Sequence, residues 1–191
     1  MFDILRENIL GRGFRPGDRL DVRALADQLG VSATPVKDAM TRLAAEGLVE
    51  IRRALECLAA EHAVSRLTPD LLSRFTAIVD ALERPVSTER ERAQHDQKNV
   101  ELHTLLVETS GNRRLTDLYR SLNAHLVVAR VHSRRSPEES RLDQERREHR
   151  AILEALDARD ATALVAALDR HIRRAGAALV DDVREAGVGA A

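Results

Sequence analysis

Apolar residues recur every three to four positions along almost all of this chain, which is the spacing of amphipathic helices. Two neighbouring stripes are well defined: Val22, Leu25, Ala26 and Leu29, then Val36, Ala39, Met40, Leu43 and Ala44. Gly30 separates them and can take the left-handed conformation that ends a helix. Asp21 and Ser32 are suitable N-caps. The pattern predicts two short helices joined by a tight turn.

The rest of the chain is divided by breaking residues. A helix over 2–10 is expected to end at Gly11 and Gly13. Gly47 is expected to end the second helix of the pair, and residues 48–51 are short and apolar enough for a single strand. Only helical patterns occur after that, over 52–66, 68–84, 88–109, 112–132, 137–157 and 159–185. Six helices with short breaks predict an antiparallel bundle.

Composition agrees with a mainly α fold, since only three Phe and one Tyr occur and strands are usually richer in aromatic residues. The length of 191 residues, with 43% apolar, fits two small domains. We expect an N-terminal (winged) helix-turn-helix domain over 1–51 and a C-terminal antiparallel all-α helical bundle over 52–191.

Charge and cysteine content limit the partners and the cellular compartment that we expect for this protein. The net charge is −1, and residues 1–51 hold seven Arg or Lys against eight Asp or Glu, so attraction to DNA must come from local clusters. The single Cys57 excludes a disulfide within the chain and fits a reducing compartment. No apolar run approaches the ~20 residues of a membrane span. We expect a cytoplasmic protein without membrane contact.

The start of the second short helix is the candidate DNA-reading surface, because a recognition helix presents its N-terminal residues to base edges. The candidate DNA-binding residues are Arg23, Ser32, Ala33, Thr34, Lys37 and Arg42. The spacing of apolar residues does not by itself establish DNA binding, because two helices around a glycine turn also occur in proteins that do not bind DNA.

The residues of this segment are more specific than its periodicity. PGDRL followed by LADQLGVSATPVKDAMTRLAAEGLVEI closely resembles the winged helix-turn-helix of the GntR family of bacterial transcription regulators, over residues 5–51. Arginines of the family's S-R-T-P-V-R-E-A-L run contact guanines and phosphates. This chain has Ala33 and Lys37 at those positions, and Lys cannot make the bidentate contact of Arg. Arg23 resembles a third DNA-contacting arginine.

The resemblance departs from the family at the wing. There the strand after G-L-V continues through a hairpin, whereas here VEIR runs directly into RRALECLAAEHA. A two-stranded hairpin needs roughly 15–20 residues. Two alternatives stay open: a real deletion, or a wing that the sequence as given does not include.

Four polar residues occupy positions that a helical bundle buries. Asn99 and His103 are spaced i, i+4 and share a helix face, while His149 and His171 each lie in an apolar stripe of another helix. Neutral imidazoles bind Zn²⁺, Ni²⁺ or Mn²⁺, and three of them with an oxygen donor leave positions for water or a small anion. Taken singly, each histidine is more often a hydrogen-bonded core residue.

The C-terminal part also resembles a known domain. RRALECLAAEHA, NVELHTLLVETSGNRRL and REHRAILEALDARDATALVAALDRHI are similar to the FCD effector-binding domain of the FadR subfamily of GntR regulators. The resemblance implies a divalent metal ion held by Asn99, His103, His149 and His171, a small carboxylate effector, and effector binding by Arg52. The other histidines, His62, His95, His125 and His132, are interpreted as surface or linker residues.

Three functions are compared. The first is a ligand-responsive transcription regulator, a repressor that binds a DNA operator as a homodimer because pseudo-palindromic operators need two recognition helices. The second is a metal-dependent hydrolase; it lacks an H-E-x-x-H motif, and Glu101 and Glu148 should point away from His103 and His149. The third is a dimeric metal- and ligand-binding protein whose DNA binding is impaired by the missing wing. The effector, the metal, the operator and the direction of the response are not specified by the sequence.

Overall fold

A computed structural model describes Ile4 and residues 21–132 and 139–188; for 123–132 and 183–188 it describes the backbone alone. Within these residues every regular element is a helix and none is a strand, which confirms the mainly α fold class. The helices are α2 (Val22–Leu29), α3 (Ala33–Arg66), α4 (Pro69–Leu82), α5 (Glu89–Thr109), α6 (Arg113–His132), α7 (Glu139–Asp157) and α8 (Ala161–Val188). Of the helix expected over 2–10, only Ile4 is described, as a helical residue, and the rest lies outside the described residues.

The turn between α2 and α3 is formed as the sequence predicts. Asp21 Oδ1 accepts hydrogen bonds from the backbone N–H groups of Arg23 and Ala24, at 2.8 and 3.2 Å. Gly30 ends α2 with a φ of 66°. Ser32 occupies the N-cap of α3 with extended backbone, although its side chain makes no capping hydrogen bond there. The buried residues of this small unit are Leu25, Ala26, Val36 and Ala39.

The prediction of a helix end at Gly47, a strand over 48–51 and a new helix at Arg52 was wrong. One helix, α3, runs through all three features for 34 residues, a length of about 51 Å. A side chain added to Gly47 would meet nothing within 4 Å, so this glycine is a tolerated helix position that costs roughly 1 kcal/mol relative to Ala. The helix persists because its residues pack extensively against α8.

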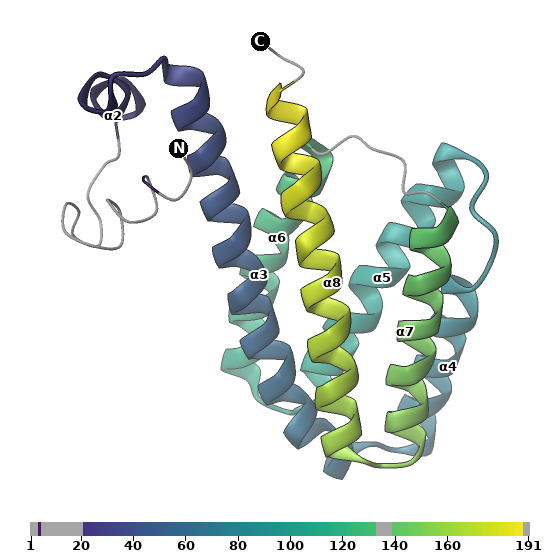
Figure 1. Ribbon diagram of the computed structural model, residues 1–191. Coiled ribbons are helices and arrows are strands. Elements are labelled where there is room, and N and C mark those ends of the chain that lie inside the picture. Colours follow the sequence, from purple (N-terminus) through teal and green to yellow (C-terminus); the bar gives the residue numbers. More distant parts are fainter. Residues whose placement is uncertain (1–3, 5–20, 133–138, 189–191) are drawn as a thin grey trace.

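Helices α3 and α8 run side by side in opposite directions, and α2 lies against the first turns of α3 at one edge of the molecule (Figure 1). The main core lies further along, where α3, α4, α5, α7 and α8 meet. It includes Ala63 of α3, Phe75 of α4, Leu106 of α5, Ile152 of α7 and Leu168 of α8. In the described part of the chain, no helix is both long and apolar enough to cross a membrane.

Candidate functional site

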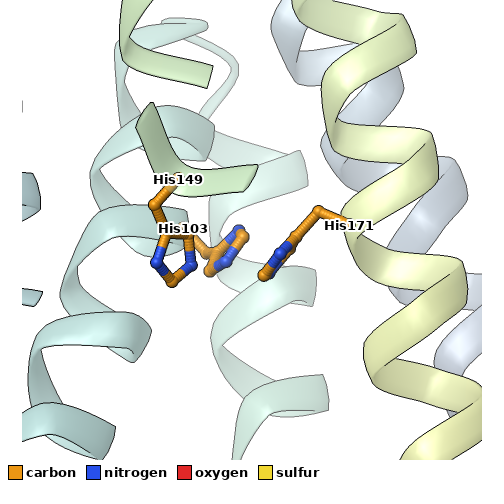
Figure 2. A group of neighbouring side chains, drawn as sticks. All are labelled: His103, His149 and His171. Atoms are coloured by element: carbon orange, nitrogen blue, oxygen red, sulfur yellow. The ribbon is translucent and has the colours of Figure 1, made fainter. Parts of the chain in front are cut away.

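Three histidines from three helices converge inside the bundle. His103 of α5, His149 of α7 and His171 of α8 point toward one another (Figure 2), and one ligating nitrogen from each lies within 4.8 Å of the others. Ring centroids are 6.0 Å apart for His103 and His149, and 4.7 Å apart for His149 and His171. None is more than 1% exposed. The three residues that sequence spacing placed on separate helices therefore form one buried cluster.

Two carboxylates orient two of these rings. His103 Nδ1 donates to Glu56 Oε2 at 2.6 Å, and His171 Nδ1 donates to Glu148 Oε2 at 2.9 Å. With the proton on Nδ1, Nε2 of each ring carries the lone pair that can bind a metal ion. Carboxylates that fix ligand histidines in this way are common around protein metal sites.

Glu56 is the centre of a wholly buried polar network. Its Oε1 accepts from Arg52 Nε and from the Tyr119 hydroxyl, each at 2.6 Å, while its Oε2 accepts from His103. Burial alone would raise the pKa of Glu56, but the Arg52 charge and these hydrogen bonds outweigh it and hold the pKa well below its ordinary value. The carboxylate therefore stays ionised, and α3 is tied to α5 through His103.

His149 and His171 are electrically neutral near pH 7. Burial lowers the pKa of His171 to about 4, despite the opposing hydrogen bond to Glu148. Burial, followed by the neighbouring charges of His171 and His103, lowers the pKa of His149 well below its ordinary value. Burial would raise the pKa of Glu148, but hydrogen bonds from His171, Gln144 and Arg174 outweigh it and lower the pKa to about 2. Neutral imidazole is the form that binds metal ions.

Several buried polar atoms at the cluster have no hydrogen-bond partner among the residues described. They are both ring nitrogens of His149 and Oδ1 of Asn99, which is 3% exposed and lies one turn before His103 on α5. Glu145 Oε1 is 3.9 Å from His149 Nε2, too far for a hydrogen bond. Leaving such groups unpaired costs roughly 1–3 kcal/mol each. This donor set therefore fits a bound metal ion.

Some site residues were missed or misplaced by sequence reasoning. Arg52 is 6% exposed and its Nε is engaged by Glu56, a pairing that the i, i+4 spacing of the two residues could have revealed. His95, interpreted as a surface or linker residue, is buried at 7% exposure. It lies one turn before Asn99, so helical spacing would have placed it on the same face. His62 is exposed, as expected, and the side chains of His125 and His132 lie outside the described ones.

Glu101 and Glu148, the acidic residues considered for a hydrolase, point away from the histidines that are nearest to them in the sequence. Glu101 is exposed and accepts from Lys98 Nζ at 2.6 Å. Glu148 contacts His171 of the adjacent helix, rather than His149. The partner of Glu148 was not visible from the sequence, because it depends on how α7 and α8 are packed.

The candidate DNA-reading residues gather at the start of α3 and at the front of α2. Arg23, Ser32, Ala33, Thr34 and Lys37 are all exposed. Arg42 is half-buried, and its Nε lies 3.3 Å from Glu46 Oε1. Exposure at the N-terminal turn of the second helix is what a helix-turn-helix needs in order to reach base edges.

A helix-turn-helix attached to an all-α bundle with a buried polar centre defines the class of DNA-binding transcription regulators that carry a second domain. Profile comparison agrees: the bacterial regulatory proteins of the gntR family match residues 1–54, and the FCD domain matches residues 47–174. The chain belongs to the GntR family of regulators that carry an FCD domain. Both matched families are regulators, not enzymes.

Curated relatives are regulators as well. The chain is 26% identical over 175 residues to the uncharacterized HTH-type transcriptional regulator YdhC of Bacillus subtilis, covering 80% of this chain and 77% of that protein. It is 30% identical over 139 residues to the Nta operon transcriptional regulator of Aminobacter aminovorans, covering 61% and 65%. It is 27% identical over 203 residues to the HTH-type transcriptional repressor RspR of Escherichia coli, covering 91% and 84%.

Solved structures share the fold. E. coli McbR/YncC matches with a TM-score of 0.60 and 21% identity, over 93% of this chain and 94% of that one. Streptococcus agalactiae GntR matches with a TM-score of 0.55 and 21% identity, over 93% and 97%.

The alignments with relatives contain positions that this chain lacks. For YdhC, 80% of the 191 residues is about 153 residues, aligned over 175 positions, which leaves about 22 without a counterpart here. For the Nta operon regulator, 61% is about 117 residues over 139 positions, which again leaves about 22. For RspR, 91% is about 174 residues over 203 positions, which leaves about 29, so the excess differs among the relatives.

Proposed function

We propose that this protein is a homodimeric repressor whose binding to a DNA operator is modulated by a small carboxylate, bound at a divalent metal ion in the bundle. The observation that carries the proposal is the buried convergence of His103, His149 and His171. It lies in a domain joined to the helix-turn-helix by the unbroken helix α3.

The metal ion would be held by the three histidines together with Asn99. Zn²⁺, Ni²⁺ and Mn²⁺ suit this set of nitrogen and oxygen donors. Support comes from the unpaired atoms of His149 and Asn99 and from the carboxylates that orient the other two rings. All four ligands are uncharged, so the ion keeps its positive charge among them and attracts an anion. When bound, it would supply a Lewis-acidic position for one carboxylate oxygen.

Arg52 is proposed as a second contact for the effector. It is a buried cation on α3, linked to His103 by the carboxylate of Glu56. Glu56 accepts from Nε, and Tyr119 also hydrogen-bonds the guanidinium, so an effector would meet Arg52 through a terminal nitrogen. A guanidinium is suited to this task because its geometry matches that of a carboxylate.

On the DNA side, Arg23, Ser32, Ala33, Thr34, Lys37 and Arg42 would contact the operator. Ser32, Ala33 and Thr34 lie where base edges would be met, and the cations Arg23, Lys37 and Arg42 suit guanines or phosphates. A homodimer would place two such surfaces on the half-sites of one operator.

Helix α3 offers a direct connection between the two ends. It begins at the proposed DNA surface and carries Arg52 and Glu56 beside the histidine cluster. An effector changes operator affinity only if it binds the DNA-bound and free conformations differently. A shift of α3 relative to α8 on binding would meet that condition.

The test combines metal analysis with operator binding. Operators are selected from random duplexes by the metal-loaded protein, and affinity is then measured by fluorescence anisotropy with and without metal and with a panel of small carboxylic acids. The proposal expects bound metal at one ion per chain and an operator affinity that at least one acid changes. His149→Ala should lose both the metal and the response, whereas His62→Ala, an exposed histidine on α3, should keep both. Equal operator affinity under all conditions would refute the switch.

A second candidate is favoured by the continuity of α3 through residues 47–52, where the resemblance to the GntR family would lead us to expect a wing. If this chain has no wing, the contacts that a wing would make with DNA are lost, and the bundle would act as a metal- and ligand-binding dimer with weak DNA binding. Fewer phosphate contacts reduce the slope of log affinity against log salt. A salt titration separates the candidates: a flat slope and weak binding to every duplex, alongside intact metal binding, would favour this one.

A further inference from the structure

Helix α5 carries a buried polar row that extends beyond the metal cluster. His95, Asn99 and His103 lie at four-residue intervals and therefore share one face of the helix. Their exposures are 7%, 3% and 1%. The first residue of the row, His95, is not a ligand in the proposed metal site.

His95 lies beside the cluster without belonging to it. The group of nitrogens within 4.8 Å of one another comprises His103, His149 and His171 only, among the residues described. Helical rise places the backbone of His95 about 6 Å from Asn99 and about 12 Å from His103 along the axis. Burial is the main cause of the lowered pKa of His149, followed by His171, His103 and then His95, so the rings of His95 and His149 are within electrostatic reach of each other.

A metal ion would leave His95 without a partner. Its Nε2 is buried and makes no hydrogen bond within the described structure. An ion held by the cluster satisfies His149, whereas His95 contributes no nitrogen to the group within 4.8 Å and lies about 12 Å from His103 along the axis of α5. An unpaired buried nitrogen is unfavourable, so a second polar group is needed at this position.

We propose that His95 is the distal anchor of the effector site and that the site takes a small dicarboxylate. One carboxylate of the ligand lies at the histidine cluster, and the other accepts a hydrogen bond from His95 Nε2. The axial offset of about 6–12 Å between His95 and the cluster residues of α5 is too long for a single carboxylate and suits an acid with several carbon atoms. The inference rests on the proposed function, because the cluster must first bind a metal ion and a carboxylate.

The experiment compares two acids with the same number of carbon atoms, succinate and butyrate. Their affinities for the zinc-loaded full chain are measured by calorimetry, and zinc affinity is measured separately by competition with a chelator. A hydrogen bond to a charged group corresponds to roughly a 10- to 100-fold difference in affinity. We expect wild-type protein to prefer succinate by about that factor.

Variants then assign the preference to one residue. His95→Leu keeps similar bulk without a donor and should bind both acids equally, with unchanged zinc affinity. His95→Gln keeps a donor and should retain part of the preference, which also guards against misfolding of the leucine variant. His62→Leu is the surface control and should behave as wild type.

Each contrary outcome has a distinct meaning. Equal binding of the two acids by wild type, or an undiminished preference in both His95 variants, overturns the role of His95 and leaves the proposed function standing. Loss of zinc from either His95 variant also overturns it, because His95 would then belong to the metal site. Failure of the zinc-loaded wild type to bind either acid contradicts the carboxylate part of the proposed function and removes the inference with it.

Discussion

Replacement of Glu56 by glutamine tests whether one buried carboxylate both stabilises the bundle and orients a metal ligand. Glu56 is fully buried and accepts from three donors, Arg52, Tyr119 and His103. The glutamine side chain would have one acceptor oxygen and one amide group. If the oxygen keeps Arg52 and Tyr119, the amide faces the Nδ1 proton of His103, and two donors are opposed.

The size of the effect can be estimated from this geometry. Breaking a buried ion pair by neutralising one partner costs about 3–5 kcal/mol, and for a chain of this length this lowers the melting temperature by roughly 6–20 °C. His103 can relieve the clash by moving its proton to Nε2, but that proton then occupies its ligand atom. Metal affinity should therefore fall by about 10- to 100-fold.

The assay pairs Glu56→Gln with Glu61→Gln, a substitution of an exposed residue further along α3. Urea unfolding of the metal-free proteins measures stability, and chelator competition measures zinc affinity. The control should change stability by less than about 0.5 kcal/mol. Adding Arg52→Met to the Glu56→Gln variant removes the unpaired cation and should restore part of the stability. Lost stability with unchanged zinc affinity would refute the orienting role, and equal effects of Glu56→Gln and Glu61→Gln would refute both roles.

Three further outcomes are expected. A Cβ at Gly176 would clash with Cγ1 of Val49. Gly176→Ala should therefore lose about 1–3 kcal/mol of stability by overpacking, and less in a Val49→Ala background; additive urea-unfolding energies would contradict this. The metal-free protein should lose about 3 kcal/mol of stability as pH falls from about 6.5 to 4. The reason is that His171 has a pKa of about 4 in the folded protein, so the unfolded chain takes up that proton first. Equal urea midpoints at pH 7 and pH 4 would exclude this effect. Zinc at 100 times its dissociation constant should stabilise the chelator-treated protein by about 2.7 kcal/mol but leave His149→Ala unchanged in thermal melts.

The helix-turn-helix could be predicted because its signals are local. Asp21 and Gly30 act through their own backbone and side-chain geometry, and the structure has α2 beginning and ending beside them. The wrong break at Gly47 has a tertiary cause. The stripe of α3 that faces the bundle continues through Val49, Arg52 and Glu56, but two of these residues are charged and so do not register as apolar positions.

The candidate site could be predicted only in part, because only some of its residues are close together in the sequence. Asn99 and His103 share a helix, so their spacing is visible in the sequence, whereas the approach of His149 and His171 depends on packing between helices. Glu148 reaches His171 across that packing, and Tyr119 reaches Glu56 from α6. No sequence interval encodes those distances. His95 was missed because a buried histidine without an apolar stripe around it looks like a surface residue.

Because α3 is continuous, the number of residues at the junction near residue 50 sets the angle between the side chains at its two ends. Each residue of a helix adds about 1.5 Å of length and about 100° of rotation around the axis. One residue inserted after Gly47 would swing Ser32 and Lys37 through more than a quarter of a turn around the axis, relative to Arg52 and the histidines. Seven inserted residues would return nearly to the same bearing, displaced by about 10 Å. The length of this helix therefore sets the direction in which the DNA-reading surface faces, and that direction recurs with the helical period of about 3.6 residues, most closely after about 7, 11 and 18 inserted residues.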